Sequence, residues 1–104
     1  MKFGSKPVPE RLFTLARERL LNNATSTPED VRRHLLKHGQ AELLATNSIE
    51  HNHRIIAQRV FDAVRLELVH SGALVQFKRG LWATSKFMQS ADDSDAEHAA
   101  KTAT

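Results

Sequence analysis

Three side chains between positions 54 and 65 carry the hydrogen-bonding chemistry with which proteins distinguish the bases of a nucleic acid. They are Arg54, Gln58 and Arg65. An arginine can donate two hydrogen bonds to O6 and N7 of guanine, and a glutamine amide can pair with adenine. At 100° per residue the three project from one side of a helix, with Asp62 beside them. The pattern predicts a base-contacting surface or, more simply, the polar face of an amphipathic helix.

A basic turn follows the same segment. In LVQFKRGLWAT, two short apolar runs with β propensity flank Lys78, Arg79 and Gly80, which predicts a hairpin with two cations at its tip. Cations at such a tip suit contact with phosphate or with a minor groove, although any surface hairpin also needs polar residues there. Upstream, Asn52 and His53 stand at the expected helix start, where DNA-reading helices contact base edges. The predicted DNA-contacting residues are therefore Asn52, His53, Arg54, Gln58, Arg65, Lys78 and Arg79.

Other kinds of site find less support in the sequence. His34 and His38 share a helical face, but a zinc site needs a third ligand from another element, so we expect no metal. The letters HNH at 51–53 lack the larger scaffold of the nuclease motif that they resemble. The chain has no cysteine, no glycine-rich phosphate loop and no Gly-x-Ser-x-Gly turn. Glu29 and Asp30 are better placed to complement a helix N-terminus. We therefore expect neither an enzyme nor a cofactor.

Charge is distributed unevenly along the 104 residues, whose formal net charge is +3. Lys and Arg outnumber Asp and Glu before residue 88, whereas the last seventeen residues carry four acids, Asp92, Asp93, Asp95 and Glu97, against Lys101. A basic body favours a polyanionic partner such as nucleic acid. The sequence contains no apolar stretch of 18 residues and no secretory signal, so we expect no membrane partner and a cytoplasmic location.

The elements that must position these side chains follow from periodicity and capping. Apolar spacing predicts a first helix from about Pro9 to Asn23. Thr27 as N-cap, Pro28 at N1 and a final glycine predict a short second helix that ends at Gly39. A long third helix is expected over 53–71. Its buried face is predicted to comprise Ile56, Ala57, Val60, Phe61, Val64 and Leu68.

The hairpin register follows from a two-residue turn at Arg79 and Gly80. Such a turn predicts that Lys78 opposes Leu81, Phe77 opposes Trp82 and Val75 opposes Thr84. The predicted fold is mainly α with a small β-hairpin: a winged helix-turn-helix of three helices plus a two-stranded wing. We place a flexible lead at 1–7, the winged-helix domain at 8–87 and a disordered acidic tail at 88–104.

The run RVFDAVRLELVHSGALVQFKRGLWATS resembles the N-terminal winged-helix domain of Mrr-type restriction endonucleases. The matching positions are Arg59, Val60, Ala63, Gly72, Leu74, Arg79, Gly80, Trp82 and Thr84. The RGLWAT wing is the most specific part. Because the chain stops about where the family's nuclease domain would begin, the resemblance implies a DNA-binding domain without nuclease catalysis.

These observations predict that the chain binds double-stranded DNA, as a small transcriptional regulator or a DNA-associated accessory protein. The alternative is a winged-helix module that binds another protein. Trp82 and the off-stripe residues Ile55, Leu66 and Val69 would then form the binding surface or a homodimer contact.

Overall fold

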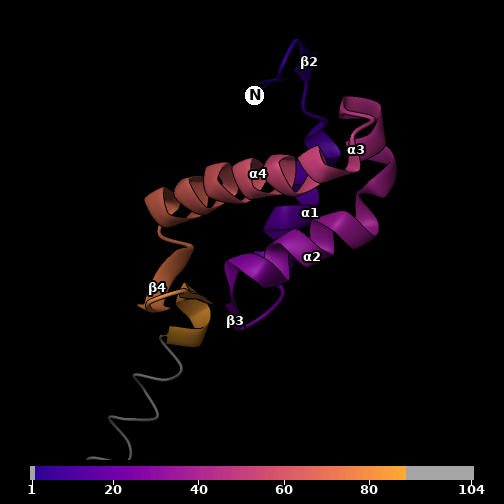
Figure 1. Cartoon of the computed structure of the whole chain (residues 1–104). Helices are drawn as coiled ribbons and strands as arrows, with labels where there is room; N and C mark the ends of the chain where they lie inside the picture. Colours follow the sequence, from indigo (N-terminus) through magenta and orange to yellow (C-terminus); the bar gives the residue numbers. More distant parts are fainter. Residues whose placement is uncertain (1, 89–104) are drawn as a thin grey trace, which may run out of the picture.

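The computed structural model describes residues 2–88, which are mainly helical with two small antiparallel sheets (Figure 1). The helices are α1 (Glu10–Leu21), α2 (Pro28–His38), α3 (Gln40–Thr46) and α4 (Glu50–Ser71), and residues 85–88 add a helical turn. The strands are β1 (Lys2–Phe3), β2 (Lys6–Pro7), β3 (Thr25–Ser26), β4 (Leu74–Lys78) and β5 (Leu81–Thr84). Figure 1 shows α1 and α2 on one side of the long helix α4.

Helix α2 begins and ends where its local sequence predicts. The Thr27 hydroxyl accepts a hydrogen bond from the Asp30 backbone N–H at 3.1 Å, and the Asp30 carboxylate accepts one from the Thr27 N–H at 3.0 Å. This reciprocal pair is a capping box. At the other end Gly39 is buried, and an added Cβ would overlap the Leu12 side chain of α1. This close approach explains why a glycine stands at the corner between α2 and α3.

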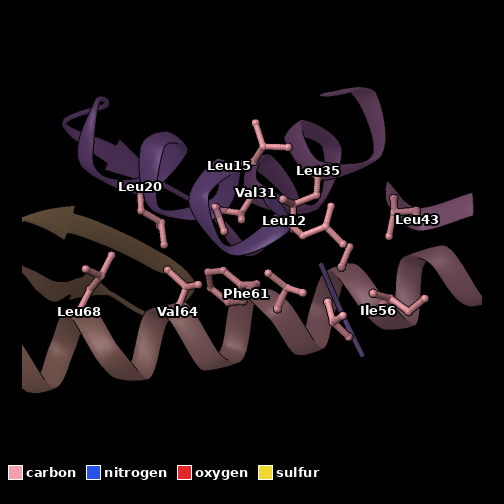
Figure 2. Packing of buried hydrophobic residues seen from close by; sticks show 14 of the residues in the cluster. Leu12, Leu15, Leu20, Val31, Leu35, Leu43, Ile56, Phe61, Val64 and Leu68 are labelled. Carbon is pink, nitrogen blue, oxygen red and sulfur yellow. The ribbon is translucent and has the colours of Figure 1, made fainter. Parts of the chain in front are cut away.

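The core lies between α4 and the two helices beneath it. The predicted buried face of α4 is confirmed, because all of its members are buried: Ile56, Ala57, Val60, Phe61, Val64 and Leu68. They join one cluster with Leu12 and Leu20 of α1 and with Val31 and Leu35 of α2, as Figure 2 shows. Leu43 brings α3 into the same cluster. The core therefore fixes the orientation of α4 and, with it, the direction of every polar side chain on that helix.

The larger sheet has three strands in the order β3–β5–β4. The sequence predicts only the hairpin of β4 and β5, and the structure adds β3, whose Thr25 pairs with Ala83. In the hairpin, the predicted pairing of Lys78 with Leu81 is confirmed. A bulge between Gln76 and Lys78 then shifts the remaining pairs.

The bulge makes two predicted pairs wrong. Trp82 opposes Gln76 instead of Phe77, and Val75 opposes Ala83 instead of Thr84. Since Phe77 is the additional residue of the bulge, its ring leaves the Trp82 face and lies edge-on to Phe87, with ring centroids 6.1 Å apart. The predicted aromatic pair across the strands is therefore replaced by a contact between the hairpin and the turn that follows it.

Three further expectations differ from the described structure. The expected three helices become five helical segments within residues 2–88, because 40–46 is helical and 85–88 forms a turn. Helix α4 starts at Glu50 rather than near residue 53. Where the sequence predicts a flexible lead at 1–7, β1 and β2 pair around Gly4. Of the expected disordered acidic tail, 89–104 lies outside the described residues.

None of the helices in the described part of the chain is both long and apolar enough to cross a membrane. The longest, α4, mixes its buried face with arginines, carboxylates and histidines. Helix α4 therefore has a buried apolar face and carries polar side chains outside it.

Candidate nucleic-acid interface

Glu29, in the first turn of α2, is the centre of an arginine cluster. Its carboxylate lies 2.6 Å from Nη2 of Arg32, 3.3 Å from Nε of Arg33 and 3.9 Å from Nη2 of Arg54. Arg32 and Arg33 are one helical turn further along α2, whereas Arg54 comes from the first part of α4. The cluster therefore joins the two helices on the flank where they lie side by side.

Electrostatics favour the ionised form of the central carboxylate. The hydrogen bond from Arg32 lowers the pKa of Glu29 below its usual value, and the charges of Arg32, Arg54 and Arg33 lower it further, against a smaller opposing effect of desolvation. The carboxylate therefore stays charged at neutral pH and holds three guanidinium groups together. The arginines outnumber it, so the cluster remains positively charged.

A chain of polar contacts continues from this cluster along α4. Arg32 donates a hydrogen bond to the Gln58 amide oxygen, and the Gln58 amide nitrogen donates to Asp62 at 3.0 Å. Asp62 also lies 3.9 Å from Nη2 of Arg65. Both ends of the Gln58 amide are therefore engaged within the protein. Gln58, which the sequence predicts to contact adenine, instead links α2 to α4.

Arg65 connects the helical flank to the sheet. Its guanidinium lies 5.2 Å from the centroid of the Trp82 indole and 6.0 Å from that of the Phe61 ring. Only 27% of the Arg65 side chain is exposed, against 68% for Arg54. Of the two arginines predicted to contact bases, Arg54 thus reaches solvent and Arg65 packs against aromatic rings.

The start of α4 differs from its predicted role as a surface that contacts bases. His53 is buried, and its Nε2 lies 2.7 Å from the backbone oxygen of Asn47. Asn52 donates a weak hydrogen bond to the Asn47 side chain at 3.3 Å. Both residues hold the loop between α3 and α4 in place. The spacing of His53, three residues before Ile56 and four before Ala57, already places it on the buried face, but the sequence interpretation treats it as a base-contacting residue at the helix start.

The hairpin tip presents its cations outward. Lys78 and Arg79 are exposed, and within residues 2–88 neither forms an ion pair with a carboxylate. Gly80 adopts φ +76°, a left-handed conformation that glycine accepts without strain. Trp82, on the next strand, ties the hairpin to α4 through Arg65. The two groups of cations therefore belong to one connected framework.

The structure brings some of the predicted residues together and separates others. Arg54, Gln58 and Arg65 share one flank of α4, as predicted, but only Arg54 is largely exposed. The sequence interpretation missed Arg33, whose side chain is 75% exposed beside Arg54. The spacing of Arg32 and Arg33 three and four residues after Glu29 is the signal that points to the cluster.

The histidine pair of α2 does not extend into a metal site. The rings of His34 and His38 lie 4.6 Å apart, and no group of three or more potential ligands occurs within residues 2–88. Desolvation, followed by the neighbouring His38, lowers the pKa of His34. His34 is therefore best described as a neutral, partly buried side chain that packs within α2.

A scan against protein-family models, a search of the curated proteins and a search of the solved structures each found no match. The resemblance of the RGLWAT segment to Mrr-type domains therefore stays a prediction from the sequence. What the chain does has to be argued from the arrangement of its own side chains.

Proposed function

We propose that this chain binds duplex DNA through Arg33, Arg54, Lys78 and Arg79. The observation that carries the proposal is a connected set of exposed cations. Arg33 and Arg54 project from the flank between α2 and α4, and Lys78 and Arg79 project from the hairpin tip. The Arg65–Trp82 contact links that flank to the hairpin. Exposed arginine and lysine side chains contact mainly the phosphates of DNA, and these contacts fix the position of the protein on the duplex.

The order of the elements supports a winged-helix interpretation. A strand, β3, lies between α1 and α2 in the chain and joins β4 and β5 in one sheet, directly after the long helix α4. This order is compatible with a winged helix-turn-helix that carries one additional short helix, α3. The resemblance of the hairpin to Mrr-type wings supports the same fold. On this proposal the β4–β5 hairpin is the wing, and the chain is a small transcriptional regulator or a DNA-associated accessory protein.

The internal contacts assign different roles within the predicted set. Glu29, Arg32 and Gln58 hold the flank in a fixed shape, so the exposed arginines do not have to be ordered when DNA binds. Arg65 and Trp82 hold the wing. The groups left to touch DNA are few and positively charged, and the proposal therefore favours phosphate contact over extensive base contact.

A mobility-shift titration with a random-sequence duplex over a series of salt concentrations tests this proposal. Four phosphate contacts predict a slope of about −3 to −4 in log K against log salt. Replacing Lys78 and Arg79 with alanine removes two of them, so the slope should fall to about half of that value. Arg54→Ala should weaken binding further, because it removes a third exposed cation.

Arg11→Ala supplies the matched control. Arg11 is 60% exposed in its side chain and pairs with Glu42, away from the arginine cluster. The control loses the same charge as Arg54→Ala and should keep most of the affinity. Equal losses from the two substitutions would show that net charge alone drives binding. An absence of binding at low salt would contradict the proposal outright.

A second function has one observation in its favour. The outward face of α4 carries exposed apolar side chains, among them Ile55, Leu66 and Val69. Exposed apolar side chains grouped on one helix are typical of surfaces that contact protein. This supports a protein-interaction module, alone or in addition to DNA binding, and the identity of the protein partner is the next question.

A further inference from the structure

The C-terminal half of α4 carries an apolar stripe on the side that faces away from the core. Leu66 is 64% exposed and Val69 is 41% exposed, although both are large and apolar. Ala63 lies between them and the N-terminal half of the helix, and Asp62 and His70 border the group. We call these five residues the α4 outer stripe. Their spacing of three and four residues places them along one helical face.

The surface of the α4 outer stripe is uneven as well as apolar. A shallow hollow lies beside the projecting Leu66, where Ala63 offers only a methyl group. It is lined by Ala63, Leu66, Glu67, Val69, His70 and Ser71. Helices α1 and α2 lie on one side of α4 (Figure 1) and pack against its buried face, to which Leu66 and Val69 do not belong. Ala63 and the exposed Val69 lie at equal distances along the chain on either side of Leu66, so a two-fold axis at Leu66 would bring each to the other in a second copy.

We propose that the α4 outer stripe binds a second copy of this chain, with the two α4 helices antiparallel and a two-fold axis at Leu66. Under this symmetry, a residue that precedes Leu66 by a given number of positions faces the residue that follows Leu66 of the partner subunit by the same number. Leu66 then packs on Leu66 of the partner subunit, and Ala63 receives Val69 of the partner subunit. Rows of residues three or four apart form the ridges through which two helices pack.

Hydrogen-bond complementarity favours a second copy over an unrelated partner. The same symmetry places Asp62 opposite His70 of the partner subunit, and it does so twice. An imidazole N–H can donate to a carboxylate, so each acid receives a donor. The Asp62 side chain is half exposed, which leaves it accessible for this contact although Gln58 and Arg65 approach it from the other side. One symmetry operation thus pairs the apolar residues and the polar residues together.

A single introduced thiol tests the geometry directly, because the chain contains no cysteine. Leu66→Cys would place two thiols at the two-fold axis, within reach of a disulfide. Mild oxidation should convert most of this variant to a covalent dimer. Leu44→Cys is the matched control, because Leu44 is also exposed, at 51%, but lies on α3. Equal cross-linking of the two variants would overturn the proposal.

Sedimentation equilibrium without DNA provides an independent measurement. The unmodified chain should show a mass that rises toward the dimer with concentration, and Leu66→Glu should raise the dissociation constant about ten-fold or more by burying a charge. Asp62→His should also weaken association, and adding His70→Asp should restore it. A monomer at all concentrations would overturn the proposal, as would a failure of the double variant to recover.

The outcome does not depend on the proposed DNA binding. Leu66 is largely exposed and is not one of the proposed DNA contacts, so Leu66→Glu should leave the helical circular dichroism unchanged and should remove no DNA-contacting group. A dimer that binds no DNA would support the stripe and contradict the proposed function. DNA binding by a strict monomer would do the reverse.

Discussion

The guanidinium of Arg65 lies over the indole ring of Trp82, 5.2 Å from its centroid. This contact joins the C-terminal half of α4 to β5. Arg65 also lies 3.9 Å from Asp62 and 6.0 Å from the centroid of the Phe61 ring, so its guanidinium has three partners within the protein. We therefore expect Arg65 to stabilise the fold rather than to contact a ligand.

The Arg65–Trp82 pair should contribute measurably to stability. A double-mutant cycle with Arg65→Ala and Trp82→Leu should give a coupling free energy of about 0.5–1 kcal/mol, typical of a cation lying over an aromatic ring. Urea denaturation followed by circular dichroism measures it. Arg59→Ala serves as the control in the same cycle, because Arg59 lies over Phe3 instead. If the Arg59 and Arg65 cycles give the same coupling with Trp82, the assigned contact is wrong.

The capping box of α2 should make the stability of the folded state depend on pH in the acid range. A hydrogen bond from the Thr27 backbone N–H lowers the pKa of Asp30 below its usual value. The carboxylate therefore stabilises the folded state above the unfolded pKa of about 3.9, and this contribution is lost as the pH falls below that value toward the lower folded pKa. We expect Asp30→Asn to destabilise at pH 7 and to approach the unmodified chain in acid.

Thr27→Ala removes the other half of the box and should cost about 1 kcal/mol at pH 7. Thermal unfolding at a series of pH values measures both variants. Thr14→Ala, which removes an exposed hydroxyl from the middle of α1, should cost less than about 0.5 kcal/mol. A constant penalty for Asp30→Asn from neutral pH down to acid would disprove the assigned role of the carboxylate.

Features set by neighbouring residues could be predicted from the sequence. The capping of α2, its end at Gly39 and the buried face of α4 depend on spacing and cap chemistry within one element, and the structure confirms all three. The exposed cations at 78 and 79 also follow from a local turn. In each case the relevant contacts lie within a few residues along the chain, where pattern is informative.

Features that depend on contacts between different helices and strands could not be predicted from the sequence. Glu29 looks like a partner of the helix dipole until folding brings Arg54 of α4 to it. The sequence interpretation assigns His53 to a base-contacting surface, but the loop between α3 and α4 brings the carbonyl of Asn47 within 2.7 Å of its Nε2. Of the candidate site, the sequence therefore predicts which residues are polar and on which side of α4 they lie. It does not predict which of them have partners within the protein.

Gly39→Ala should destabilise the fold although alanine favours helices. An added Cβ would lie 2.8 Å from the Leu35 carbonyl oxygen and would overlap the Leu12 side chain. Separating α1 from the α2–α3 corner should cost about 1–3 kcal/mol, the usual penalty for overpacking. Chemical denaturation measures it, with Gln40→Ala, at an exposed neighbouring position, as the control. Unchanged stability would mean that the corner adjusts without strain.

Removing residues 89–104 should strengthen DNA binding modestly, by about two- to five-fold at low salt, because the segment carries four acids against one lysine. The gain should disappear above about 0.3 M salt, where such interactions are screened. Binding titrations of the full chain and the truncated chain measure this. A chain of full length in which Asp92, Asp93, Asp95 and Glu97 become amides separates charge from length. Equal affinity of all three would show that the acidic segment does not compete with DNA.

If the dimer and the DNA-binding function both hold, the geometry of α4 predicts the spacing of the DNA sites. Arg54 precedes Leu66 by 12 residues, about 18 Å along a helix, so the two Arg54 side chains of an antiparallel pair lie about 36 Å apart. This separation matches the approximately 34–36 Å, or about 10 base pairs, between half-sites one turn apart on a duplex. Random-oligonucleotide selection should therefore enrich inverted repeats with that spacing.

Insertion of about 5 base pairs between the selected half-sites rotates one of them to the opposite face of the duplex and should abolish cooperative binding. Insertion of a full turn moves the sites apart on the same face and tests whether the separation itself matters. Leu66→Glu should bind each half-site singly, with no dependence on spacing, because the two copies are no longer joined. Selected sites without symmetry would contradict the two-fold arrangement on DNA. Cooperativity that survives both the insertion and Leu66→Glu would place the contact between copies outside the α4 outer stripe.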